Sequence, residues 1–184
     1  MSSARSALAF DVSRLGRRPG SMITVTDAVA SPSRIGLDLI AIEAGAPLEL
    51  DLRFESVSEG VLVTGSVSAP TSGECSRCLS PLTSAVRIDL TELYAYPDSA
   101  TEQSSEADEV GHVVNDTVDL EQAIVDAVGL ELPLSPVCAP DCEGLCPHCG
   151  IALAEEPGHS HELIDPRWAK LADLKVVDPS QDSK

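Results

Sequence analysis

The stretch Leu48-Glu-Leu-Asp-Leu-Arg-Phe-Glu-Ser-Val57 alternates apolar and charged side chains as far as Glu55. Successive side chains of an extended chain point to opposite faces, so the leucines and Phe54 gather on one face and the charged residues on the other. This period of two is typical of a β-strand with one face in a core and one in water. Ser58-Glu-Gly60 then has turn chemistry, and Val61–Ala69 is again rich in valine. The two runs therefore predict an antiparallel hairpin.

Other runs of the chain predict strands around this hairpin. Ser21–Ala30 and Ile35–Ile42 precede it, and Val86–Tyr96 follows it with the same alternation. Pro70–Gly73 is expected to interrupt the chain between strands. The acidic segment 97–109 has almost no apolar side chains, so it cannot bury enough surface to offset the entropy of ordering. We expect it to be a mobile loop.

Two segments carry helical signals. Asp119–Leu132 starts with a candidate N-cap and ends before Pro133, and its apolar residues follow the helical period. The stripe consists of Leu120, Ile124, Ala127, Val128 and Leu132. Near the C-terminus, Asp165 followed by Pro166 predicts a sharp helix start. We expect Trp168 to dock this helix on the core or beside the cysteines.

The composition limits the classes of function. The chain has 184 residues and a formal net charge of -18. A charge of this sign excludes a protein whose whole surface binds nucleic acid, although it allows a local basic patch. No apolar run has the length of a membrane span, and the N-terminus lacks the apolar core of a secretory signal. We expect a soluble, cytoplasmic protein.

Cysteines and histidines provide the clearest chemical signal. Cys146-x-x-Cys149-Gly150 has the spacing of a zinc knuckle, and Cys75-x-x-Cys78 repeats it. The remaining candidates are Cys138, Cys142, His159 and His161. Six cysteines and two histidines supply eight ligands, enough for two tetrahedral zinc ions. We favour one site of Cys146, Cys149, His159 and His161, and a second of Cys75, Cys78, Cys138 and Cys142.

Other uses of these side chains stay open. Cys138, Cys142, Cys146 and Cys149 can form one local site, which leaves Cys75 and Cys78 for another task. An even number of cysteines is also compatible with disulfides, and a C-x-x-C pair can be a redox motif of the thioredoxin kind. The thioredoxin motif requires a pair that opens a helix, whereas Cys75 is expected at a hairpin tip. We therefore favour a structural metal.

The fold class that follows is α+β. We predict an antiparallel β-sheet or open barrel with one or two packed helices and a C-terminal zinc-knuckle module. The predicted divisions are a β-rich domain with one helix at 1–132, a metal-binding module with the C-terminal helix at 133–176, and a disordered tail at 177–184.

A small group of arginines near the N-terminus is a candidate phosphate-binding patch. The group consists of Arg14, Arg17 and Arg18, and Arg77 lies between the first pair of cysteines. The guanidinium group suits phosphate because it donates two parallel hydrogen bonds. A solvated turn before Pro19-Gly20 is the alternative interpretation of the N-terminal arginines.

The sequence contains no motif that predicts catalysis. It has no glycine-rich phosphate loop, no G-x-S-x-G and no H-E-x-x-H. We therefore expect a protein that is not an enzyme. Two alternatives are a thiol-disulfide or redox-sensing protein that uses Cys75 and Cys78, and a ribonuclease, for which no carboxylate can be nominated.

Several motifs in a fixed order resemble one protein family. They are Cys75-Ser-Arg-Cys78-Leu79, Leu132-Pro-Leu, Asp141-Cys142-Glu-Gly-Leu-Cys146-Pro-His-Cys149-Gly150 and Ile164-Asp-Pro-Arg-Trp168. Together they resemble the YceD-like family of large-subunit ribosomal RNA accumulation proteins, many of which have C-x-C where this chain has His159-x-His161.

The resemblance implies a cytoplasmic bacterial factor for accumulation of 23S ribosomal RNA, acting in ribosome assembly or precursor processing without an established enzymatic activity. Its partners would be large-subunit ribosomal RNA and/or a basic large-subunit ribosomal protein. We expect no small-molecule substrate. Candidate RNA contacts are Arg14, Arg17, Arg18 and Arg77. The resemblance also implies that some relatives keep only the first pair of cysteines, which leaves the assignment of the metal ligands open.

Overall fold

A long antiparallel sheet forms the body of the protein in a computed structural model that describes residues 6–104, 110–161 and 167. Its strands are ordered β2 (Met22–Ala30), β5 (Pro47–Ser56), β6 (Gly60–Glu74), β4 (Ile40–Ile42) and β3 (Ile35–Gly36). On its other side β6 pairs along its whole length with β7 (Pro81–Ala95), and the end of β7 pairs in parallel with β8 (Gly111–His112). The sheet does not close, and the predicted antiparallel fold class is confirmed.

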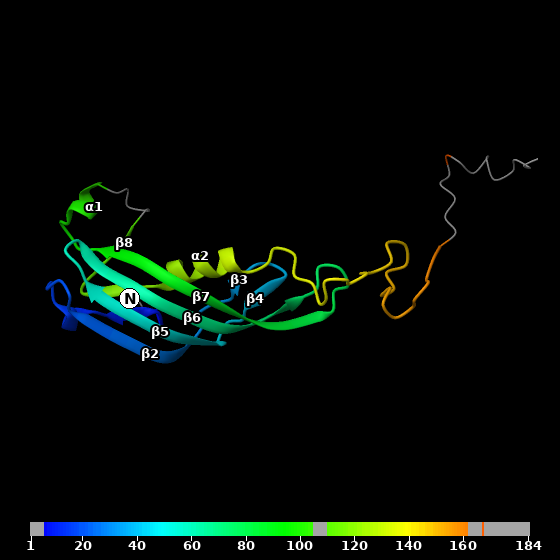
Figure 1. Ribbon diagram of the computed structural model, residues 1–184, viewed down its shortest axis with the longest axis horizontal. Helices are drawn as coiled ribbons and strands as arrows, with labels where there is room; N and C mark the ends of the chain where they lie inside the picture. Colours follow the sequence, from blue (N-terminus) through cyan, green and yellow to red (C-terminus); the bar gives the residue numbers. More distant parts are fainter. Residues whose placement is uncertain (1–5, 105–109, 162–166, 168–184) are drawn as a thin grey trace, which may run out of the picture. The chain divides into compact units, whose positions relative to one another are not determined.

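The hairpin predicted from the alternating stretch is the centre of this sheet. β5 pairs with β6 from Glu49↔Ser68 to Ser56↔Val61. The leucines of β5 and Phe54 are buried, while the charged residues between them lie on the outer face. Beyond Ser68, β6 and β7 continue past β5 as an arm, which Figure 1 shows in green. Cys75 and Cys78 lie in the loop that closes this arm.

Helix α2 (Glu121–Glu131) covers the inner face of the sheet beside β7 (Figure 1). Its buried stripe of Leu120, Ile124, Val128 and Leu132 matches the predicted stripe, and Ala127 packs against the same core. The predicted start at Asp119 is wrong, because Asp119 ends β9 (Thr117–Asp119). Its carboxylate still accepts a hydrogen bond from the amide of Glu121 at 3.0 Å, so it satisfies one of the free donors of the first turn.

Two of the predicted strand limits are also wrong. Pro70–Gly73 does not interrupt the chain but lies within β6. Pro70 is accommodated because the pairing of β6 with β5 ends at Ser68 and its pairing with β4 begins at Ser72. The run Ile35–Ile42 is a tight hairpin rather than one strand, since the amide of Leu37 donates to the carbonyl of Ile40.

The remaining described elements are short. β1 (Ala9–Asp11) pairs with β9, and η1 (Ser13–Leu15) follows β1. Helix α1 (Ala100–Ser104) occupies part of the predicted loop 97–109, a correction that reflects local capping: the Ser99 hydroxyl accepts from the amide of Glu102. The predicted C-terminal helix with Trp168 lies outside the described residues. No described helix has both the length and the apolar character that crossing a membrane requires.

The chain divides into two compact units, 1–142 and 143–184. The boundary predicted from the sequence lies after Leu132 instead. The segment that contains Cys138 and Cys142 thus lies in the first unit, because its side chains meet the tip of the β6–β7 arm. The second unit has no strand or helix longer than an isolated bridge among its described residues, and that bridge joins Leu145 to Ala152.

Candidate metal centres

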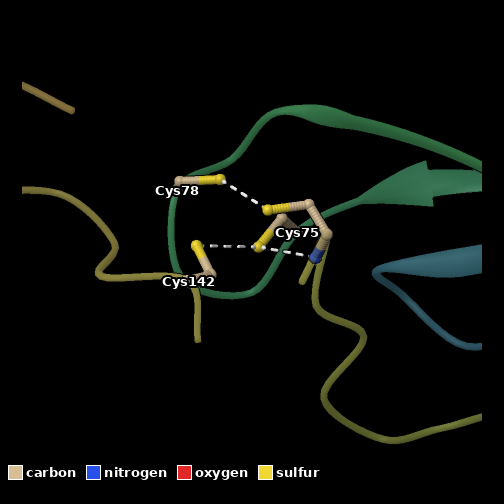
Figure 2. Close-up of side chains that lie close together, drawn as sticks. Cys75, Cys78 and Cys142 are labelled. Carbon is tan, nitrogen blue, oxygen red and sulfur yellow. Dashed lines mark hydrogen bonds between the residues drawn. The ribbon is translucent and has the colours of Figure 1, made fainter. Parts of the chain in front are cut away.

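Four cysteines converge at the tip of the β6–β7 arm and form the first centre. Cys75 and Cys78 come from the loop between the strands, and Cys138 and Cys142 come from the segment after α2. The Sγ atoms of Cys75 and Cys142 are 3.9 Å apart, and those of Cys78 and Cys138 are 3.6 Å apart. Figure 2 shows Cys75, Cys78 and Cys142 pointing toward one another. Segments far apart in sequence therefore bring four thiols to one point.

Two hydrogen bonds to backbone carbonyls hold the two parts of this centre together. The amide of Ser76 donates to the carbonyl of Pro136 at 2.8 Å, and Nη1 of Arg77 donates to the carbonyl of Cys142 at 2.9 Å. Arg77 is proposed from the sequence as a phosphate contact, but one of its N–H donors is used in a hydrogen bond within the protein. These bonds fix the segment of Cys138 and Cys142 against the hairpin tip.

Two cysteines and two histidines form the second centre, in the second unit. Nε2 of His159 lies 3.2 Å and Nε2 of His161 lies 3.3 Å from Sγ of Cys149. The two Nε2 atoms are 2.9 Å apart, and Cys146 completes the group. The candidate ligand atoms within each centre all lie within 4.8 Å of one another. The structure thus gathers the eight side chains into the same two groups that the count of eight ligands led us to favour.

The two knuckles have the same backbone geometry. In the first, the amide of Cys75 donates to the carbonyl of Ser80, and the amide of Leu79 donates to the carbonyl of Cys75. In the second, Cys146 donates to Ile151, and Gly150 donates to Cys146. Leu79 and Gly150 both have positive φ angles, 58° and 75°. In each pair, this turn points the backbone amides of the next residues toward the sulfur of the first cysteine.

Hydrogen bonds within the two knuckles lower the pKa values of three thiols. The amide of Cys78 is the main cause that lowers the pKa of Cys75 to about 6, and the amide of His148 is the main cause that lowers the pKa of Cys146 to about 6. The Ser80 hydroxyl, 2.6 Å from the sulfur, lowers the pKa of Cys78. Amide and hydroxyl donors therefore stabilise the thiolate, which is the form that binds a metal.

The spacing of the ligand atoms fits tetrahedral zinc. Zn–S bonds of about 2.3 Å at tetrahedral angles place two sulfurs about 3.8 Å apart, and a Zn–N bond of about 2.0 Å places nitrogen and sulfur about 3.5 Å apart. The Sγ distances of the first centre agree with the first value. The second centre is slightly tighter, since its Nε2 and Sγ atoms lie 3.2 and 3.3 Å apart. Both donor sets suit zinc.

A carboxylate outside the second centre orients one of its ligands. Nδ1 of His159 lies 3.3 Å from Oε2 of Glu156, while Nε2 of the same ring faces Cys149. Ligating histidines commonly donate their outer nitrogen to a carboxylate, which fixes the tautomer. Glu156 and Ser80 are not among the site residues predicted from the sequence. The position of Glu156 three residues before His159 is the only sequence signal that could have found it.

The arginines proposed as RNA contacts do not form one patch. The guanidinium of Arg17 stacks 5.0 Å from the ring centre of Tyr96, just after the end of β7, and Arg14 and Arg18 flank it in the chain. Arg77 is at the other end of β7, beside the first centre. The 15 residues of β7 separate the two places, a distance of about 50 Å at about 3.3 Å per residue.

No disulfide joins any of the six cysteines, all of which belong to the described residues. Cys75 and Cys78 do not stand as an exposed pair, since Cys75 is buried and Cys78 lies beside Cys138. The redox alternative therefore gains no support from the arrangement.

Fold and site together define a β-sheet protein with two candidate metal centres, one of four cysteines and one of two cysteines and two histidines. The family model described as "Large ribosomal RNA subunit accumulation protein YceD" matches residues 63–175, from β6 through both centres. The chain belongs to this family, as its motifs suggested.

Close relatives occur in mycobacteria. Uncharacterized proteins of Mycobacterium tuberculosis and Mycobacterium bovis are each 65% identical over 178 residues, which cover 97% of this chain and 85% of the relative. An uncharacterized Mycobacterium leprae protein is 55% identical over 179 residues, covering 97% of this chain and 82% of the relative. No solved structure matches the chain significantly.

Proposed function

We propose that this protein is a non-enzymatic, cytoplasmic factor for biogenesis of the large ribosomal subunit. It supports accumulation or processing of 23S ribosomal RNA by binding RNA and/or a basic ribosomal protein. The observation that carries this proposal is the family match, which spans both candidate centres and whose description names accumulation of large-subunit ribosomal RNA. Nothing in the arrangement of the thiols favours the redox alternative.

Zinc is the metal that we assign to both centres. Cys75, Cys78, Cys138 and Cys142 would hold one ion, and Cys146, Cys149, His159 and His161 the other. Each ion would have four protein ligands, which is typical of a structural site, whereas a catalytic zinc has three and keeps one position for water. Bound zinc would supply cross-linking between chain segments rather than activation of a substrate.

The second unit has the greater need for such a cross-link. Cys146 is its only buried apolar side chain in the part that the structure describes. A segment without an apolar core cannot offset the entropy of ordering, so metal binding has to supply the folding free energy. The first centre has a different task, since it fixes the chain after α2 to a sheet that already has a large core.

Charge decides which parts can contact phosphate. Between Glu143 and His161 the chain carries three glutamates and neither lysine nor arginine, so the second knuckle does not suit RNA. Direct phosphate contacts would fall to the candidate arginines, Arg14, Arg17, Arg18 and Arg77, while the acidic remainder of the surface suits a basic ribosomal protein. The two kinds of partner can therefore bind to different parts of the molecule.

Depletion of the protein in its host tests the proposal. We expect a lower level of mature 23S ribosomal RNA and of large subunits in a density gradient, with small subunits unaffected. Expression of the wild-type chain should restore both, and Cys75→Ser or Cys146→Ser should restore them less well at equal protein level. Unchanged ribosomal RNA and subunit levels after complete depletion would refute the proposed function.

A further inference from the structure

The outer edge of β7 is open over most of its length. β7 pairs with β6 from Pro81 to Ala95, but on its other side it pairs only through Tyr94 and Ala95, with β8. From Pro81 to Leu93 no described strand lies on that side. The backbone N–H and C=O groups of an open edge are a template for pairing with another extended chain.

A pocket opens at this edge, below the end of α2. It has a volume of about 150 Å³, and four consecutive residues of β7, Ser84 to Arg87, line one side of it. Glu131, Leu132 and Pro133 line the other side. The pocket, which can hold a side chain, thus lies next to backbone that can pair with a strand.

Thr71, on β6, forms another part of this pocket and lacks a hydrogen-bond partner. The residue is 2% exposed, and its Oγ1 is the only buried side-chain nitrogen or oxygen of the described residues without a partner. A buried hydroxyl without a partner has lost its hydrogen bonds to water without replacing them, so such groups are rare. A side chain that enters the pocket with a polar end would satisfy it.

The surroundings of the pocket select the charge of the occupant. Glu131, at the end of α2, is the acidic residue that lines it, and the charge of Arg87, which also lines it, is offset by Asp89 at 4.0 Å. α2 also carries Glu121 and Asp126 and has no basic residue. Close to Glu131, Leu130 and Leu134 are 89% and 82% exposed, although large apolar side chains are usually covered. An acidic rim with exposed leucines fits a partner segment that is both basic and apolar, and repels the phosphates of RNA.

We propose that the open edge of β7 and the pocket beside Glu131 bind an extended, basic segment of a partner protein by strand pairing, with one large side chain of that segment in the pocket. This inference rests on the proposed function, because it names the class of partner as protein rather than RNA. Main-chain hydrogen bonds to β7 supply the affinity, while the pocket and Glu131 supply the specificity.

The test uses the full-length, zinc-loaded protein and a labelled peptide of alternating lysine and valine with one central tyrosine. We expect binding by fluorescence anisotropy and slower amide exchange at Ser84–Arg87 in the complex. Methylation of alternate backbone nitrogens of the peptide should abolish binding, since these nitrogens can no longer donate to β7. Equal binding of the methylated peptide, or protection elsewhere in the chain, would overturn the proposal.

Matched variants separate a built site from general attraction between opposite charges. Glu131→Lys should weaken binding about tenfold, while Glu49→Lys, an equal charge change on the outer face of β5, should leave it unchanged. Thr71→Val should weaken binding severalfold without lowering the melting temperature, because it removes only an unpaired hydroxyl. Equal losses in the two lysine variants would overturn the proposal.

Two other occupants are outcomes of the same experiment. Protection of Ser84–Arg87 by a labelled single-stranded RNA, or by self-association of the chain in sedimentation, would overturn the proposal in favour of that occupant. If the peptide fails to bind but the chain still restores 23S ribosomal RNA after depletion, the edge proposal falls and the proposed function stands. If depletion has no effect on ribosomal RNA, the proposed function falls regardless of the peptide.

Discussion

Leu79 occupies in the first knuckle the position that Gly150 occupies in the second. Each is the residue directly after the second cysteine, each donates its amide to the carbonyl of the first cysteine, and each has a positive φ angle, 58° for Leu79 and 75° for Gly150. Glycine adopts this conformation without steric cost, but leucine does not. The first knuckle therefore contains backbone strain that the second avoids.

Leu79→Gly should stabilise the protein. The substitution removes the steric cost of a left-handed leucine, which exceeds the added entropy of glycine in the unfolded chain, so we expect a net gain of about 0.5–1 kcal/mol. Leu79 is 55% exposed, so little apolar burial is lost. Urea unfolding of the zinc-loaded protein measures the change. A loss of stability would show that Leu79 packs in a way that outweighs its strain.

Glu156→Gln should weaken metal binding at the second centre alone. The carboxylate 3.3 Å from Nδ1 of His159 orients the ring, and loss of such a partner costs about 10–100-fold in metal affinity. Competition with a chromophoric chelator measures this affinity. Glu155→Gln, a neighbouring change without this contact, is the control. Equal effects of the two substitutions would show that Glu156 acts only through its charge.

The thiols predict a pH dependence for the metal-free protein. The pKa values of Cys75 and Cys146 are lowered to about 6, so both groups should remain thiolates until the pH falls to about 6. These pKa values lie below the ordinary pKa of a thiol. Any stability that the thiolates contribute is therefore complete when the pH is above that ordinary pKa, and it is lost as the pH falls through about 6.

Ultraviolet absorbance of the thiolate during titration measures this dependence. Cys75→Ser and Cys146→Ser should each remove part of the step near pH 6, and bound zinc should move the step to lower pH because metal and proton compete for sulfur. A single transition in the ordinary thiol range would contradict the backbone hydrogen bonding of the two knuckles.

The sheet could be predicted where burial alone decides the structure. The alternation from Leu48 to Phe54 requires one buried face, and β5 has it. The extension of β6 through Pro70 could not be predicted, because a proline is tolerated there only where no strand adjoins β6 on that side. That gap depends on the positions of β4 and β5, which lie far from Pro70 in the sequence.

The number of candidate ligands could be predicted, since eight suit two tetrahedral ions, but the sequence left open which four share an ion. The residues that contact the candidate ligands could not be predicted from the sequence. The Ser80 hydroxyl reaches Cys78 and the Glu156 carboxylate reaches His159 only because of the way each turn folds. The separation of Arg17 from Arg77 likewise follows from the length of β7, which begins at Pro81 rather than at the predicted Val86.

Metal content per chain tests the central claim most directly. Elemental analysis of protein purified without added metal should find two zinc ions per chain, bound by the two groups of four ligands. A count of reactive thiols before and after chelation should show all six cysteines protected by the metal. One zinc with reactive Cys75 and Cys78 would contradict the two-centre arrangement. Absence of metal together with a Cys75–Cys78 disulfide would contradict the structural role of both centres.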